Sequence, residues 1–220
     1  MKISILTDNH TSWFVHYGKI LEQELIILGH EVKYVFNKFD LEGGDICFLL
    51  SCSRIIEDKF LLLHKNNIVV HASDLPKGKG FSPLQWQILE GSNNIILSLI
   101  EAVTEVDAGP IYFKHSVLFK GHELYNELRN VLGLEIIVMC VKFVNQYNQL
   151  KPVRQDGEST FYKKRTDLDD QVDPSKSIIE LFNHFRIADS QNYPLYFNLY
   201  GHKYLIRIEK YLNKEKGYFK

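Results

Sequence analysis

Two segments of this chain place a histidine and a carboxylate where they can act as a pair. His71 ends the β-branched run of residues 68–70 and precedes a Pro-containing segment, which predicts that its imidazole lies at the carboxyl end of a buried strand. Asp107 lies thirty-six positions later, in a turn just before Ala-Gly-Pro. A carboxylate beside an imidazole orients the ring and favours its charged form. These two residues are therefore the first candidates for catalysis.

Three segments around these residues resemble the catalytic core of the folate-dependent formyltransferases. That family carries a His-x-Ser-x-Leu-Pro segment, then Gly-x-x-Pro, then a Val/Met-Asp-x-Gly-x-Ile loop; this chain has HASDLP at 71–76, GFSP at 80–83 and VDAGPI at 106–111. One position departs from the family's usual triad, because Val69 stands where the family has Asn. Loss of an amide that stabilises an oxyanion typically costs about 100- to 1,000-fold in rate. The resemblance therefore indicates the fold more firmly than the activity.

The resemblance implies transfer of a formyl group from 10-formyltetrahydrofolate, a co-substrate, to an amine, without a metal. It gives His71 the role of proton acceptor or oxyanion stabiliser, and Asp107 the role of orienting and charging the imidazole. A lone histidine is more often a hydrogen-bonded structural residue, and we interpret most of the nine histidines in that way. His71 differs because its neighbours and its separation from Asp107 match the family together.

The same resemblance implies a folate site. Arg54 and Ile56 lie in a segment similar to the family's pterin-binding segment, and the loop that contacts the pterin edge through its backbone corresponds to Val103, Thr104, Glu105 and Val106. Backbone groups of a loop pair well with a flat, polar-edged heterocycle. A surface residue at the start of a helix is an equally good interpretation of Arg54.

The formylated amine has to be inferred from what surrounds this core. Glycinamide ribonucleotide formyltransferases hold a phosphate on a Gly-rich loop after the first strand, but residues 7–12 here contain no glycine. Methionyl-tRNA formyltransferases append a larger basic domain that grips RNA, whereas about 70 residues follow the long helix in this sequence. We keep the tRNA enzyme as the second hypothesis.

Sugar N-formyltransferases, which act on nucleotide-linked aminodeoxy sugars for surface polysaccharide of the O-antigen type, give the preferred interpretation. Residues 160–166 resemble a linker motif of those enzymes, in which Lys164 and Arg165 would hold a pyrophosphate beside aromatic residues. Lys77 and Lys79, close to the histidine, are further candidates for an anionic substrate. A solvated run of charges is the alternative explanation for the linker cations. Trp86 is expected to fill the core.

A hypothesis of a different class follows from Val69. Without the family's Asn, the domain could be a catalytically silent module that binds folate or a nucleotide sugar. The retention of both His71 and Asp107 favours an active enzyme.

Composition agrees with a compact enzyme. The 220 residues are 45% hydrophobic, and the net charge of -1 with a pI near 6.8 exerts no general attraction on nucleic acid. The three cysteines form no CxxC pair and are expected to be core residues in a reducing compartment. No segment is long and apolar enough to cross a bilayer. We therefore expect a cytoplasmic protein without membrane or nucleic-acid partners.

Strands and helices alternate along the first part of the sequence. The patterns predict strands at 3–6, 32–36, 45–50, 68–71, 94–102 and 110–118, and helices at 14–28, 55–64, 83–90 and 122–149. Gly29 is expected to cap the first helix, and Ser82 to cap the helix that follows it at 83. The expected fold is a doubly wound, mostly parallel, Rossmann-like α/β sheet over residues 1–150.

Residues 151–220 are expected to form a smaller module. A polar linker leads to a helix opened by residues 173–177 and ending near Ala188, and an alternating tail at 193–211 predicts a β-hairpin joined around Gly201. An isolated hairpin is marginally stable in water, so it has to pack on the main domain or on a second subunit. The aromatic character of the tail favours a homodimer.

Overall fold

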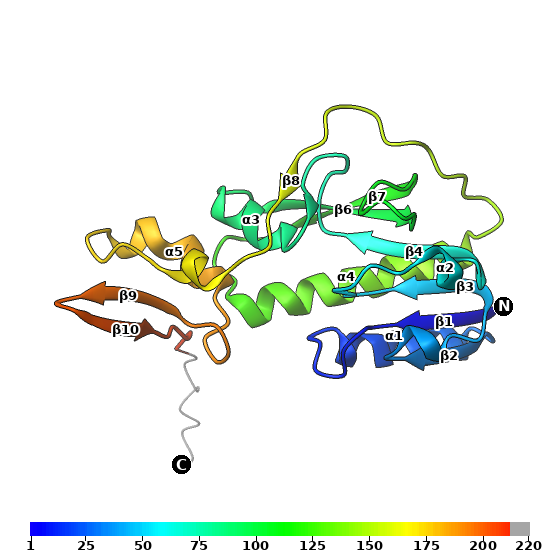
Figure 1. The fold of residues 1–220 in the computed structure, drawn as a ribbon, viewed down its shortest axis with the longest axis horizontal. Helices are drawn as coiled ribbons and strands as arrows, with labels where there is room; N and C mark the ends of the chain where they lie inside the picture. Colours follow the sequence, from blue (N-terminus) through cyan, green and yellow to red (C-terminus); the bar gives the residue numbers. More distant parts are fainter. Residues whose placement is uncertain (212–220) are drawn as a thin grey trace, which may run out of the picture.

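The computed structural model describes residues 1–211 of the chain (Figure 1). Its strands and helices follow in chain order: β1 (Lys2–Leu6), α1 (Val15–Ile27), β2 (Glu31–Val35), a 3-10 turn (Lys38–Asp40), β3 (Gly44–Leu49), α2 (Asp58–Leu61), β4 (His64–His71), β5 (Lys79–Gly80), α3 (Pro83–Leu89), β6 (Asn94–Glu101), β7 (Ile111–Leu118), α4 (Tyr125–Asn145), β8 (Phe161–Tyr162), a second 3-10 turn (Asp167–Asp170), α5 (Ile178–Ile187), β9 (Leu195–Leu199) and β10 (His202–Ile206).

Six strands form the central sheet, in the order β2-β1-β3-β4-β6-β7. The pairings of β1 with β2, β1 with β3, and β3 with β4 are parallel, whereas β6 runs antiparallel to both β4 and β7. The expected mostly parallel α/β sheet is confirmed. Parallel strands are buried on both faces, and Ile5 and Phe48 on one face and Leu6 and Cys47 on the other accordingly have no exposed surface.

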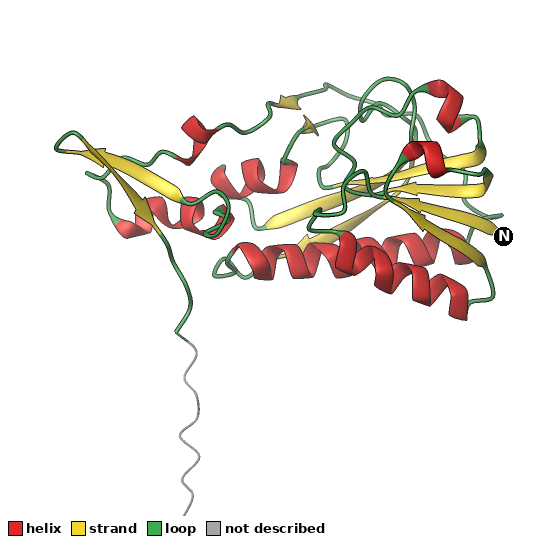
Figure 2. Ribbon diagram, turned by 60° about the horizontal axis from the view of Figure 1, so that its bottom comes forward, coloured by secondary structure: helices red, strands yellow, loops and turns green. Residues whose placement is uncertain are grey.

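Helices α1 and α4 lie side by side on one face of the sheet (Figure 2). Their apolar sides pack with the strands in the largest hydrophobic cluster of the protein. A second hydrophobic cluster includes Leu49 of β3, together with Ile56 and Phe60 from the segment between β3 and β4; Phe60 belongs to α2. The loops that follow the strands therefore emerge from a sheet that is packed on both faces.

The first helix ends as expected at Gly29. This residue has a φ of +83°, its N–H donates to the carbonyl of Ile26 (2.9 Å), and His30 N–H donates to the carbonyl of Leu25 (3.1 Å). These two bonds satisfy carbonyls that a helix end otherwise leaves without partners, and glycine adopts the required left-handed conformation without steric cost.

One local expectation is wrong, and two hold in position but differ in detail, because Ser82 is the N-cap residue of α3 and Ser177 is that of α5. Residues 55–64 are helical only over Asp58–Leu61, and β4 begins already at His64, because His64 pairs with Gly44 of β3. Ser82 has a left-handed conformation (φ +53°) and its side chain makes no capping bond. The later helix begins at Ile178 after Ser177, whose hydroxyl accepts from Glu180 N–H, so residues 173–176 form a turn before it.

The C-terminal segments follow the expected order. Residues 151–166 cross the surface, and β8 within this segment pairs with β5. Farther along the chain, β9 and β10 form an antiparallel hairpin that turns at Gly201 (Figure 1). Helix α5 contacts α3 and α4. The division of the chain into 1–150 and 151–220 stays a prediction, as does the homodimer, and residues 212–220 lie outside the described part.

A buried ion pair joins α5 to the main sheet domain. The Arg186 side chain is 1% exposed, its Nη2 lies 3.4 Å from Glu123 Oε2, and its Nε donates to the Glu123 carbonyl (3.3 Å). The Glu123 carboxylate also accepts the backbone N–H groups of Lys120 and Gly121. Removal of one partner from such a pair leaves a buried charge without compensation.

We therefore expect Glu123→Ala to lower the free energy of unfolding by about 3 kcal/mol or more, measured by urea denaturation. The control is Glu127→Ala, because Glu127 pairs with Lys210 at the surface and such a pair contributes about 0 to 1 kcal/mol. Equal losses in the two variants would contradict a structural role for the buried pair.

Candidate active site

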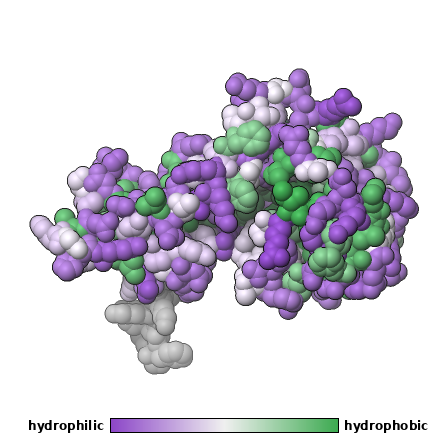
Figure 3. Space-filling model, viewed as in Figure 1, coloured by the Kyte–Doolittle hydropathy of each residue, from purple (hydrophilic) through white to green (hydrophobic). Residues whose placement is uncertain are grey.

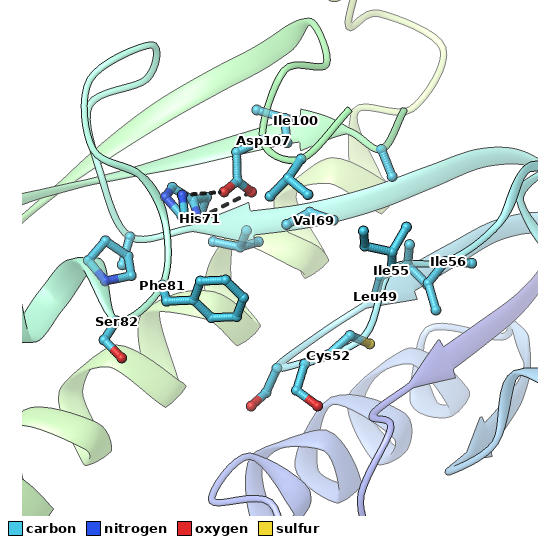
Figure 4. A pocket seen from close by; sticks show the side chains of 18 of the residues that line it. Leu49, Cys52, Ile55, Ile56, Val69, His71, Phe81, Ser82, Ile100 and Asp107 are labelled. Carbon is cyan, nitrogen blue, oxygen red and sulfur yellow. Dashed lines mark hydrogen bonds and ion pairs between the residues drawn. The ribbon is translucent and has the colours of Figure 1, made fainter. Parts of the chain in front are cut away.

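His71 lies at the end of β4, and both of its ring nitrogens face oxygen atoms. Nε2 donates to the carbonyl of Gly78 (2.8 Å), and Nδ1 lies 3.4 Å from Oδ1 of Asp107 (Figure 4). The residue is 8% exposed. A carbonyl only accepts hydrogen bonds, and an ionised carboxylate does the same. Both ring nitrogens of His71 therefore face hydrogen-bond acceptors.

Asp107 reaches His71 because its loop folds back across β4. The loop leaves β6 beside the middle of β4, where Ala102 N–H donates to the carbonyl of Asn67 (2.6 Å). Oδ2 of Asp107 accepts the N–H of Gly80 (2.8 Å), so the carboxylate also fixes the segment that follows β4. The structure thus brings together the two residues that the sequence analysis selected for catalysis.

The Asp107 loop is held in a strained conformation. Asp107 has a φ of +54°, and the amide of Gln155, from the linker, donates to the carbonyls of Asp107 (2.7 Å) and Gly109 (2.8 Å). Ser51 and Ser82 also have positive φ values, and all three residues line the same cavity. Backbone strain of this kind is concentrated at functional sites.

The cavity beside His71 and Asp107 has a volume of about 420 Å³. Its wall is mainly apolar and includes Leu49, Ile56 and Val69, with Phe81 projecting toward it from the opposite side (Figure 4). The space-filling view shows apolar residues gathered on the sheet domain, whereas the surface of the C-terminal module is mostly hydrophilic (Figure 3). A concave apolar site with a few polar groups is the usual form of a small-molecule site.

Most residues expected to bind folate line this cavity. Arg54, Ile56, Val103, Thr104 and Val106 are part of its wall, but Glu105 is not. Arg54 belongs to an exposed loop before α2, and its backbone N–H donates to Asp8 Oδ2 (2.9 Å). The alternative view of Arg54 as the start of a helix is therefore wrong.

The cations expected to bind the second substrate lie elsewhere. Lys77 and Lys164 are exposed and do not line the cavity. Lys79 is 6% exposed, with its Nζ 5.6 Å from the centre of the Phe161 ring. Arg165 forms an ion pair with Asp170. A role for these cations requires a substrate that extends beyond the cavity.

Sequence patterns missed several residues of the cavity wall, of which three have side chains that can contact a polar or aromatic ligand. Trp13, Gln85 and Arg129 line the cavity, but they lie outside the recognised motifs. For Arg129 a signal was available, because it precedes Leu132 and Ile136 by three and seven positions and so lies on the same face of a helix.

Trp86 is not the core residue that was expected. It is half-buried, its ring stacks near that of Tyr162 with centres 6.3 Å apart, and its Nε1 donates to the Lys163 carbonyl (2.9 Å). An indole N–H usually finds a partner when the ring is partly buried, and here the linker supplies it. Trp86 therefore holds the linker against α3.

Cys52 also lines the cavity, but its chemistry is unsuited to nucleophilic attack. Burial raises the pKa of its thiol to about 12, and the sulfur lies 3.4 Å from the Leu6 carbonyl, to which it can donate. The thiolate is the nucleophilic form of cysteine. Cys52 is therefore a packing residue at neutral pH.

Neither a metal cluster nor a membrane-spanning helix occurs within residues 1–211. No three His, Cys, Asp or Glu side chains converge there as a metal site would require. No helix in that range is both long enough and apolar enough to cross a bilayer.

Gly109 controls the approach of the Asp107 loop to β6, because a Cβ atom at this position would lie 1.7 Å from the Glu101 carbonyl oxygen. We expect Gly109→Ala to displace the loop and to lower the free energy of unfolding by about 2 to 4 kcal/mol, measured by urea denaturation. Gly91→Ala is the comparison. A Cβ there meets nothing within 4 Å, so only the left-handed backbone costs energy, roughly 1 kcal/mol. A loss no larger than that of Gly91→Ala would contradict the steric argument.

The sequence matches known formyltransferases. The family model described as formyl transferase matches residues 30–133. The methionyl-tRNA formyltransferase of Mycoplasma capricolum is 28% identical over 181 residues, which are 79% of this chain and 56% of that protein. The chain thus spans about half the length of the curated relatives it matches.

Solved structures share the fold. A methionyl-tRNA formyltransferase from Clostridium thermocellum has a TM-score of 0.80 at 20% identity and covers 98% of this chain and 95% of its own. HypX from Aquifex aeolicus, in complex with tetrahydrofolic acid, has a TM-score of 0.77 at 19% identity. The match covers 94% of this chain and 37% of HypX. A 4-N formyltransferase from Francisella tularensis has a TM-score of 0.73 at 18% identity. The match covers 94% of this chain and 97% of that protein. Residues 30–133 are thus similar in sequence to the formyl transferase family, and the chain has the fold of the solved formyltransferases.

Proposed function

We propose that the protein transfers a formyl group from 10-formyltetrahydrofolate to the amine of a nucleotide-linked aminodeoxy sugar used for surface polysaccharide. The observation that carries the proposal is the His71–Asp107 pair, with its 3.4 Å contact, at the wall of a cavity of about 420 Å³. The match of residues 30–133 to the formyl transferase family model supports formyl transfer. The 4-N formyltransferase among the structural neighbours supports a sugar amine as the acceptor.

The loop after β6 is suited to the folate. Val103, Thr104 and Val106 line the cavity and make no backbone–backbone hydrogen bond within the described chain. Their free N–H and C=O groups can pair with the polar edge of a pterin, while Ile56 supplies an apolar surface. The tetrahydrofolic acid held by HypX, a protein of the same fold, supports this assignment.

In the proposed reaction, His71 acts as the cationic donor to the oxyanion. The acceptor amine attacks the formyl carbon, the new C–N bond forms, and the bond from that carbon to the folate nitrogen breaks; the proton lost by the amine ends on the folate nitrogen. Because both nitrogens of His71 face hydrogen-bond acceptors, donation of a hydrogen bond to the oxyanion fits the ring better than acceptance of a proton. The longer Nδ1 contact with Asp107 is the one that can open toward the oxyanion.

Methionyl-tRNA remains the second candidate acceptor. The observation that favours it is that the curated relatives quoted above act on methionyl-tRNA by name. A silent binding module is the third possibility. Parallel assays with nucleotide-linked aminosugars and with methionyl-tRNA, together with tetrahydrofolate binding, separate the three hypotheses.

We expect His71→Asn and Asp107→Asn each to lower formyl transfer to a nucleotide-linked aminosugar by at least about 100-fold, because one removes the cationic donor and the other the charge that holds it. Turnover is measured beside the thermal midpoint, which we expect to change little in both variants. Near wild-type turnover in either variant would show that the catalytic assignment is wrong. Transfer to methionyl-tRNA alone would replace the proposed acceptor.

Val69→Asn tests how the site works without the family's amide. Val69 is half-buried and faces the cavity beside Leu49 and Ile56, so the new amide can reach the formyl oxygen. We expect activity to be kept or raised, and the free energy of unfolding to fall by about 1 to 3 kcal/mol if the amide lacks partners in the unliganded protein. Complete loss of turnover in a folded variant would mean that the site depends on Val69 itself.

A further inference from the structure

A part of the cavity wall not assigned to folate contains an arginine without an ionic partner among residues 1–211. Arg129 lies near the start of α4, and Trp13 lies just before α1. Arg129, Leu132 and Ile136 follow at intervals of three and four residues, so they share one face of α4, and all three line the cavity. The guanidinium therefore belongs to the cavity surface.

Aromatic rings flank this guanidinium. Its central carbon lies 4.1 Å from the centre of the Tyr125 ring and 5.3 Å from that of Trp13. Stacking of this kind orients the planar group and leaves its N–H groups, which point outward in the plane, available to a ligand.

Arg129 forms no ion pair or side-chain hydrogen bond within the described residues, although it is half-buried. Burial lowers its pKa, and the nearby Tyr125 and Asp189 only partly oppose that effect. The Asp189 carboxylate accepts instead from Asn192 Nδ2 (3.0 Å) and from Gln191 N–H (3.1 Å). A partly desolvated cation gains more from an oxyanion than a solvated one, because less water has to be displaced.

The other arginines that are at least half-buried have carboxylate partners. Arg165 pairs with Asp170, and Arg186 pairs with Glu123. Among the arginines of residues 1–211 that are at least half-buried, Arg129 thus differs from the other two, because its side chain lines a cavity and has no carboxylate partner. Its five donors suit phosphate oxygens, which it can bind in a bidentate manner.

We infer that Arg129 binds phosphate oxygens of the formyl acceptor, with Trp13 and Tyr125 holding the guanidinium in place. This inference rests on the proposed function for the identity of the acceptor, but not for the anion site itself. It assigns the pyrophosphate of a nucleotide-linked sugar to a cation inside the cavity, in place of Lys164 and Arg165 on the linker.

Tryptophan fluorescence can test the anion site without any turnover. The chain has two tryptophans, so Trp86→Phe leaves Trp13, beside Arg129, as the reporter. In that background we expect inorganic pyrophosphate and UDP to change the emission of Trp13, and succinate to do so more weakly. Arg129→Gln should weaken binding of pyrophosphate and UDP by at least about tenfold, and Arg129→Lys less, while tetrahydrofolate binding stays within about twofold.

Arg207→Gln is the matched control, because Arg207 is exposed on the C-terminal module and the charge change is the same. Unchanged pyrophosphate affinity in Arg129→Gln, or an equal loss in Arg207→Gln, would overturn the inference. If Arg129→Gln fails to fold, modification of the unsubstituted protein by phenylglyoxal decides the matter. Pyrophosphate should protect Arg129 and not Arg207, and absence of that protection would equally overturn the inference.

Failure of the inference and failure of the proposed function give different results. Formyl transfer to a nucleotide-linked aminosugar with the same KM for that sugar in Arg129→Gln would overturn the anion site and keep the function. Pyrophosphate binding that depends on Arg129, without transfer to any amine tested, would keep the anion site and overturn the function. A rise in the KM for the sugar, with the KM for folate unchanged, supports both.

Discussion

The antiparallel pairing of β6 with β4 is the constraint on which the candidate site depends. Ile68 pairs with Glu101 and His71 with Ser98, so β6 ends three residues before the end of β4 that carries His71. The following loop has to fold back along the strand to reach β7, and this path brings Asp107 over His71. The direction of one strand therefore both pairs the two residues and closes the cavity.

The ring of His71 is enclosed by polar groups of the protein and is almost out of contact with solvent. The ring is 8% exposed and lies between a carbonyl and a carboxylate, while Asp107 is itself held by Gly80 N–H. Preorganised groups in a site with little water stabilise developing charge more strongly than the same groups in water. The linker contributes too, because Gln155 fixes the Asp107 loop through two carbonyls. The segment after the long helix is thus part of the support of the site.

Charge is distributed unevenly around the cavity. Lys163 and Arg165 of the linker are paired with acidic residues of the second 3-10 turn, and they stabilise the path of the linker beside Trp86. Arg54 and Arg129 face the cavity from different elements and have no ion pair within the described residues. Paired cations contribute mainly to structure, whereas unpaired cations at a cavity are available to anionic ligands.

The sequence by itself determined the alternation of strands and helices, the glycine end of α1, the C-terminal hairpin and the choice of His71 and Asp107. Each of these follows from local periodicity, from a short motif or from a residue with special backbone freedom, and such signals survive in the linear chain. Only the tertiary structure decided that β4 begins at His64, because strand pairing with β3 overrides the local helical pattern of residues 55–64. It also decided which cations are paired and which face the cavity. The physical reason is that ion pairing and burial depend on residues far apart in sequence, as Arg186 and Glu123 show, so spacing along the chain carries little information about them.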